Sequence, residues 1–286
     1  MRGFAPVTSL GLRIVAVAAL CVSPTFAQAQ GALFEALNLE RQAGCEDQPG
    51  VRMPLQAQSR LGEAARALAE GRSLEAALAS SDYRAVRASQ ITLRGYSGPE
   101  AMARGVARHS CAALLNTTLT QAGVHVRGDV MWLVLAAPFS PPSPEQGAQV
   151  QARVLQLVNE ARRQPRRCGT KSMAAGRPLE LDETLNAVAA GHAADMARYS
   201  YFSHTARDGT RAAERASRAG YGWRSVGENL AAGQLDADAA VKGWLQSPSH
   251  CVNLMAPQFK QMGLAFAVNP ESEAGIYWVQ VFGLPE

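Results

Sequence analysis

The second half of the chain contains two kinds of hydrophobic pattern. Residues 149–163 and 181–199 carry apolar residues three and four positions apart, and a similar stretch covers 237–245. This spacing predicts amphipathic helices. Residues 263–268 and 276–282 are instead short clusters of apolar and β-branched residues, which predict strands. The second half is therefore expected to be a mixed α/β domain.

The first half has helical spacing at its start and an apolar strand at its end, over residues 130–137. The helical stripe consists of Leu61, Ala64, Ala65 and Leu68. Residues 138–147 then read PFSPPSPEQG, and so many prolines and serines cannot sustain a helix or a strand. We therefore expect an N-terminal α/β domain over 30–137, a linker over 138–148 and a second domain over 149–286.

Composition is that of a folded globular protein, because 47% of the 286 residues are hydrophobic and 18% are charged. The formal net charge is only +4. The arginines are dispersed, apart from a short run at 162–167 that is typical of a solvated face. Nucleic acid is therefore not an expected partner.

The first 29 residues predict a secretory signal peptide. Arg2 precedes an apolar run over 14–22, and the residues Ala27, Gln28 and Ala29 form an A-x-A cleavage site. No later run in the sequence is long enough to predict a transmembrane helix. We expect a secreted or periplasmic protein.

Four cysteines follow the predicted cleavage site: Cys45, Cys111, Cys168 and Cys251. An even number in an exported chain favours two disulfides, for which the sequence alone allows three connectivities. A zinc site made of four thiolates is disfavoured, because no two cysteines have the short spacing of zinc ribbons.

The two halves share a pattern when one is laid over the other, which indicates an internal repeat. The cysteines align, and this alignment pairs Cys45 with Cys111 and Cys168 with Cys251. The alternative is two unrelated α/β halves that match by chance. The matched residues are Asn38 with Asn159; Pro54, Leu55 and Leu61 with Pro178, Leu179 and Leu185; Leu114, Leu119 and Gly123 with Leu254, Phe259 and Gly263; and Trp132 with Trp278.

The first half lacks the polar residues that could carry chemistry in the second. It has no counterpart of the sequence GEN, and His109 stands one place too early to match His250. As a degenerate copy it would have a structural or partner-binding role.

Four motifs of the second half carry a family resemblance. They are YFSH at 201–204, GENLAAG at 227–233, the stretch WLQSPSHC at 244–251, and YWVQVFG at 277–283. In this order they resemble the CAP superfamily, which includes cysteine-rich secretory, antigen 5 and pathogenesis-related proteins, and they fit its bacterial secreted branch best. The resemblance implies a three-layer α-β-α sandwich for 149–286, preceded by the smaller α/β domain.

The resemblance also implies a binding cleft formed by His204, Glu228 and His250, with a divalent metal such as zinc held by the two imidazoles. Other branches of the family place a second glutamate where this chain has Ser247. The loss of that charge is expected to weaken cation binding.

Local sequence predicts the backbone around these residues. Pro248 interrupts the preceding helical pattern, so His250 is expected on a constrained loop. Glu228 is expected in a turn that enters a short strand or bend, with Asn229 holding the backbone. His192 lies on the apolar stripe of its helix and is expected to be a core histidine.

Two functions follow from this pattern. The favoured one is an exported, non-catalytic module that binds a lipid, a cell-envelope component or a protein. The alternative is a metal-assisted hydrolase of peptide or envelope material, in which Glu228 is the general base. The missing second carboxylate favours the binding module, and zinc is the only cofactor that either hypothesis invokes.

Overall fold

The computed structural model describes residues 26–286, which divide into two compact units. The boundary along the chain lies between Ala137 and Pro138. Residues 1–25, which hold most of the predicted signal peptide, lie outside the described residues. Within 26–286, none of the helices combines the length and the apolarity needed to cross a membrane.

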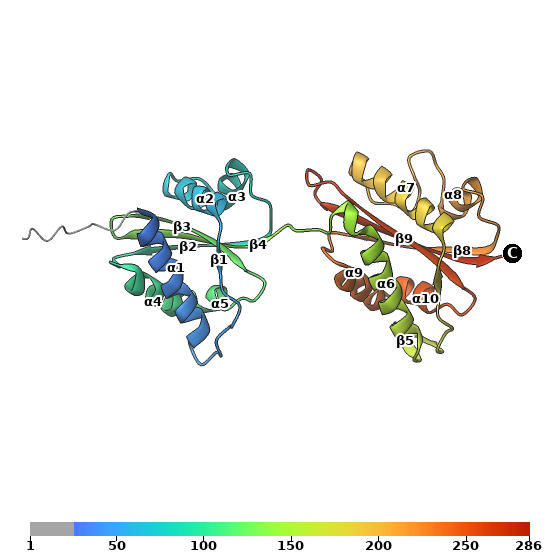
Figure 1. Ribbon diagram of the computed structural model, residues 1–286, viewed down its shortest axis with the longest axis horizontal. Helices are drawn as coiled ribbons and strands as arrows, with labels where there is room; N and C mark the ends of the chain where they lie inside the picture. Colours follow the sequence, from blue (N-terminus) through green and yellow to red (C-terminus); the bar gives the residue numbers. More distant parts are fainter. Residues whose placement is uncertain (1–25) are drawn as a thin grey trace, which may run out of the picture. The chain divides into compact units, whose positions relative to one another are not determined.

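The N-terminal unit has a four-stranded sheet between two layers of helices (Figure 1). Helices α2 and α3 cover one face, and α1, α4 and α5 cover the other. Each face buries its own apolar cluster. The elements are α1 (Phe26–Ala43), β1 (Gln56–Ala57), α2 (Ser59–Ala69), α3 (Leu74–Ser80), β2 (Ala85–Arg94), α4 (Pro99–His109), α5 (Cys111–Leu114), β3 (Gln121–Arg127) and β4 (Val130–Pro138).

The C-terminal unit is also a three-layer α-β-α sandwich, as expected (Figure 1). Helices α7 and α8 cover one face of its main sheet, and α6, α9 and α10 cover the other. The elements are a 3-10 turn (Pro144–Gln146), α6 (Gly147–Arg162), β5 (Arg166–Cys168), β6 (Lys171–Met173), β7 (Glu180–Leu181), α7 (Glu183–Tyr199), α8 (Ala212–Arg218), β8 (Trp223–Ala232), α9 (Ala237–Gln246), α10 (Pro248–Met255), β9 (Gln261–Val268) and β10 (Ile276–Pro285).

The main sheets of the two units have the same topology. Their strand orders are β1-β3-β4-β2 and β7-β9-β10-β8. In the N-terminal sheet the two-residue strand β1 pairs in parallel with β3, and β3 pairs antiparallel with β4. In the C-terminal sheet β7 pairs in parallel with β9, and β9 pairs antiparallel with β10. A glycine in β3 or β9, Gly123 or Gly263, lies where a Cβ would come within about 2 Å of the carbonyl carbon of Leu61 or Leu185. Only glycine lets the helix approach this closely.

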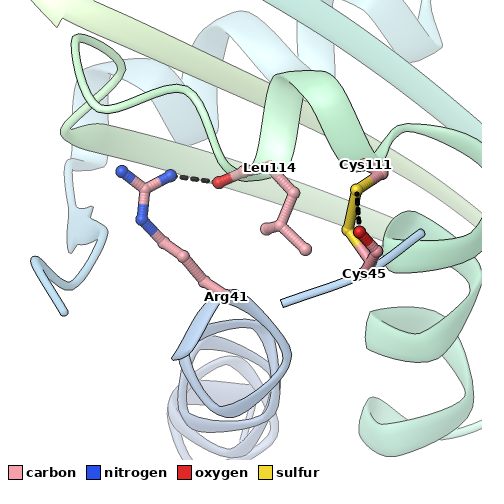
Figure 2. The surroundings of a disulfide bond; sticks show 4 residues. All are labelled: Arg41, Cys45, Cys111 and Leu114. Atoms are coloured by element: carbon pink, nitrogen blue, oxygen red, sulfur yellow. Dashed lines mark hydrogen bonds between the residues drawn. A yellow bond between two sulfur atoms is a disulfide. The ribbon is translucent and has the colours of Figure 1, made fainter. Parts of the chain in front are cut away.

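Each unit also buries an arginine at the end of its first helix. Arg41 donates from its guanidinium to the Leu114 carbonyl (Figure 2). It also donates from Nε to the Met53 carbonyl at 2.9 Å and from Nη2 to the Asn116 carbonyl at 3.0 Å. Arg162 likewise donates to four backbone carbonyls, those of Arg177 at 2.8 Å, Leu254 at 2.7 Å, Ala256 at 3.0 Å and Phe259 at 3.4 Å. Burial lowers the pKa of both arginines. The carbonyl oxygens replace the water that each buried charge has lost.

Further polar contacts occur at matching places in the two units. Asn38 exchanges two hydrogen bonds with the backbone of Leu55, as Asn159 does with Leu179. These side chains hold the segment after the first helix. Other matched contacts are Gln30 with Val124 and Gln151 with Leu264, and Tyr83 with Gln121 and Tyr221 with Gln261.

Within residues 26–286 there are two disulfides, and each closes a loop within one unit. They are Cys45–Cys111 and Cys168–Cys251, with Cα atoms 5.9 and 5.4 Å apart. Figure 2 shows the first beside Leu114, where Arg41 also anchors. A loop of this size contributes about 4 kcal/mol in the chain-entropy account.

The sheet register corrects the predicted match between Trp132 and Trp278. Gly123 pairs with Val134 and Gly263 pairs with Val281, so Trp132 corresponds to Val279. Side chains alternate between the faces of a strand. Trp132 accordingly packs in the cluster with α2, whereas Trp278 packs in the cluster with α6 and α9.

Candidate functional site

Glu228 lies within strand β8, although the sequence predicted a turn. It pairs with Val281 of the neighbouring strand β10, and its side chain is only 4% exposed. One carboxylate oxygen, Oε1, is 2.7 Å from Nδ1 of His204, whose side chain is 57% exposed. The strand therefore fixes a buried acid beneath an exposed imidazole.

Arg215 is the second partner of Glu228, and no motif in the sequence points to it. Its Nη2 donates to Oε2 of Glu228 at 2.6 Å, and its Nη1 donates to the carbonyls of His204 and Thr210. The arginine side chain is 12% exposed, so this is a largely buried ion pair. No spacing rule could have selected it from the other arginines, because only tertiary folding brings α8 to β8.

His250 lies in a helix rather than on the predicted loop. Pro248 does interrupt the preceding helix, but it also begins α10 and leaves His250 in the first turn. Proline suits this position because the first backbone N–H groups of a helix have no internal partner. Asn229 donates to the His250 carbonyl at 3.2 Å, as expected for a side chain that holds the backbone.

Buried amides connect α10 to the sheet. Asn253 donates to the carbonyl of Glu228 at 3.1 Å and to Oδ1 of Asn229 at 3.2 Å. Asn229 in turn donates to Oε1 of Gln280 at 3.2 Å, and both residues are fully buried. These bonds set the position of His250 relative to Glu228. They satisfy polar groups that would otherwise destabilise the core.

The pKa of the His250 imidazole depends on His204. Burial and then the charge of His204 lower the pKa of His250 below its ordinary value of 6.5. Because the unfolded chain then binds a proton at higher pH than the folded one, this histidine destabilises the fold as the pH falls below 6.5.

Substitution of His204 by alanine is therefore expected to raise the pKa of His250 toward 6.5, while burial keeps it below that value. NMR titration of the imidazole C–H resonances measures the change. The exposed His109 of the N-terminal unit provides the control variant, His109→Ala, which leaves the His250 titration unmoved. An unaltered His250 pKa in His204→Ala would contradict a shared cluster.

His192 is buried, as expected from its place on the apolar stripe of α7. Its Nε2 is 2.8 Å from the carbonyl of Ser203, in the loop that carries His204. The helix thus helps to position that loop.

Comparison with known proteins relates this architecture to one family. Residues 155–282 match the profile described as CAP, the cysteine-rich secretory protein family. The C-terminal unit is a CAP domain. This confirms the resemblance that the four sequence motifs carry.

The CAP domain has bacterial relatives. The chain is 29% identical over 140 residues to the uncharacterized protein YkwD of Bacillus subtilis (strain 168), covering 49% of each chain. It is 34% identical over 86 residues to the uncharacterized membrane protein YlbC of the same organism, covering 30% of this chain and 25% of that protein. The chain thus spans at most about half the length of these curated relatives.

A solved structure also resembles the chain. It is an extracellular protein containing an SCP domain from Bacillus anthracis str. Ames, with 22% identity and a TM-score of 0.41. The alignment covers 58% of this chain and 56% of that one.

Glu228 does not suit the role of a direct ligand of the divalent metal that the family resemblance places on the two imidazoles. Both oxygens of Glu228 already accept internal hydrogen bonds, and Arg215 places a positive charge 2.6 Å from one of them. Among the described residues, no three His, Cys, Asp or Glu side chains are grouped so as to hold a metal ion. The positive charge of Arg215 neutralises Glu228, as a bound cation would.

Proposed function

We propose that this protein is exported and that its CAP domain is a non-catalytic binding module. It engages a component of the cell envelope through the cluster of His204, Glu228 and His250. The predicted signal peptide and the two disulfides support export, because disulfides persist in oxidising compartments.

The double engagement of Glu228 is the observation that favours binding over hydrolysis. A general base must take a proton from water, and this requires an accessible carboxylate oxygen. Here Oε1 accepts from His204 and Oε2 accepts from Arg215, while the side chain is 4% exposed. Glu228 is thus placed to orient His204 rather than to attack a substrate through water.

The cluster suits a ligand that carries an anionic group, such as a phosphate or carboxylate of an envelope polymer or lipid. The charges of Glu228 and Arg215 balance each other, so protonation of His250 makes the cluster positive. The ring of His204 is exposed to such a ligand, while its Nδ1–H donates to Glu228 and holds the ring in place. Because the pKa of His250 is lowered from 6.5, binding is expected to strengthen as the pH falls below that value.

Co-sedimentation with purified envelope fraction tests the proposal, with wild type compared with the double variant His204→Ala/His250→Ala. We expect retention of the wild type to fall several-fold in the double variant, and His109→Ala to bind like the wild type. Equal retention of the double variant would refute the cluster as the binding site. Release of soluble envelope fragments by the wild type would instead support the hydrolase.

We also propose that the N-terminal unit is a degenerate copy of the CAP domain. The matched topology, buried arginines and disulfides support this origin. Counting along the chain from the matched Tyr83 and Tyr221 aligns Ala77 with Arg215 and Gln90 with Glu228, and counting from the matched cysteines aligns Ser110 with His250. The copy retains the contacts of the scaffold and has lost the polar cluster.

A further inference from the structure

A cavity of about 730 Å³ lies between α7, α8 and the loop that joins them. His204, Glu228 and His250 are not among the described residues that line it. It shares one wall with their cluster, because Arg215 borders the cavity and pairs with Glu228. The polar lining consists mainly of His192, Asp195, Arg207, Asp208, Arg215 and Arg218.

Two buried atoms in the cavity wall lack hydrogen-bond partners among the described residues. One is Nδ1 of His192, and the other is Nε of Arg215. The Ser203 carbonyl can only accept, so Nε2 of His192 carries the proton of the neutral ring. Burial lowers the pKa of His192, and the charge of Arg215 lowers it further, so the imidazole remains neutral. The wall therefore contains one free acceptor, Nδ1, and one free donor, the Nε–H of Arg215.

The charged groups around the cavity largely neutralise one another. Arg218 donates to Asp208 at 2.6 Å, and Arg215 is paired with Glu228. Hydrogen bonds from Thr210, followed by that of Arg218, lower the pKa of Asp208 to about 2, so it remains ionised. Three arginines thus face two lining carboxylates and Glu228 behind them. Such a wall does not select a ligand with a large net charge.

The mouth of the cavity has an ordered aromatic edge. The guanidinium of Arg207 lies 3.6 Å from the centre of the Tyr199 ring, and this stacking holds the arginine in place. Asp195, one helical turn before Tyr199, accepts a hydrogen bond from Tyr201. Burial and then Asp195 raise the pKa of Tyr201 to about 12, so Tyr201 remains a donor. Small residues of α7, including the exposed Ala187 and Gly191, also line the cavity.

We propose that this cavity binds a neutral carbohydrate, a mono- or disaccharide unit. A sugar hydroxyl both donates and accepts, so one ligand can satisfy Nδ1 of His192 and the Nε–H of Arg215. Both atoms are buried behind the wall surface, so a sugar reaches them only by displacing wall side chains, while Asp195 and Arg207 line the cavity itself and meet other hydroxyls. The small residues of α7 contact the C–H groups of the ring. The proposal goes beyond the proposed function and does not depend on it.

NMR chemical-shift mapping and calorimetry on the full chain after signal removal test this site, with glucose, N-acetylglucosamine and its β-1,4-linked dimer as probes. Glucose 6-phosphate tests the effect of charge. We expect a neutral sugar to shift amides of α7, α8 and residues 200–211, and to bind more tightly than the phosphorylated sugar. No shift with any neutral sugar, or a preference for the phosphorylated one, would overturn the proposal.

Gly191 offers a variant that fills the site without disturbing the fold. A Cβ at this position meets no atom within 4 Å, so a larger side chain enters open space. Replacing glycine within a helix also favours helix formation. We expect Gly191→Phe to weaken sugar binding by about tenfold, whereas Gly191→Ala retains it.

Two further variants separate this site from the His204 cluster. Asp195→Asn removes an acceptor at the mouth and is expected to weaken sugar binding. His250→Ala is expected to retain sugar binding, even if it loses envelope retention. Loss of sugar binding in His250→Ala, or full sugar binding in Gly191→Phe, would contradict a separate cavity site.

Discussion

Substitution of Arg162 by methionine is expected to lower the free energy of unfolding of the C-terminal unit by about 3 kcal/mol or more. The guanidinium holds the carbonyls of Arg177, Leu254 and Ala256, and methionine fills part of the volume without donating any hydrogen bond. These buried acceptors would lose their partners. Hydrogen exchange followed by mass spectrometry measures the loss peptide by peptide.

Arg41→Met is the matched variant for this experiment. If the N-terminal unit is a copy of the CAP domain, this substitution should destabilise residues 26–137 to a similar degree, because Arg41 holds Met53, Leu114 and Asn116 in the same way. Each unit then serves as the internal control for the other variant. Unchanged exchange in both units would show that the buried arginines do not brace the fold.

The substitution Glu228→Gln is expected to destabilise the C-terminal unit by about 3 kcal/mol as well. It leaves the guanidinium of Arg215 largely buried without its counter-charge, and such a loss typically costs this much. Glutamine also offers one acceptor oxygen instead of two, so either His204 or Arg215 loses its hydrogen bond. Chemical denaturation with circular dichroism measures the change.

The double variant Glu228→Gln/Arg215→Met distinguishes an ion pair from a simple packing effect. Removal of both charges is expected to recover part of the stability, because a buried pair can often be replaced by apolar groups at little cost. If the N-terminal unit is a copy of the CAP domain, Ala77 takes the place of Arg215 there, and the architecture does not require an arginine at this position. If the double variant were no more stable than Glu228→Gln, the pair would not explain the loss.

Sequence reasoning was most successful where structure is local. The predicted helix over 181–199 corresponds to α7, and the predicted strand over 263–268 lies within β9. Periodicity reports which face of an element is buried, and this information is present in any short window of sequence. The motifs around His204, Glu228 and His250 also identified the family, although they did not give the local backbone of the last two residues.

Prediction failed where one local signal has two structural outcomes. Pro248 ends one helical pattern, but the same residue is well suited to begin the next helix, and it does so in α10. Gly227 and Asn229 are common in turns, yet the pairing of β8 with β10 holds both in a strand. The match of Trp132 to Trp278 failed through a shift of one residue, which moves a side chain to the opposite face of a sheet.

The sequence by itself determined the α/β class, the CAP resemblance of the second half, the two-part organisation and the cysteines available for disulfides. Only the tertiary structure decided that Arg215 neutralises Glu228 and that Arg41 and Arg162 are buried braces. The physical reason is distance along the chain. Arg162 donates to a carbonyl 92 residues away, and Arg215 to an acid 13 residues away on another element. Such partners are chosen by how the layers pack, which no local pattern encodes.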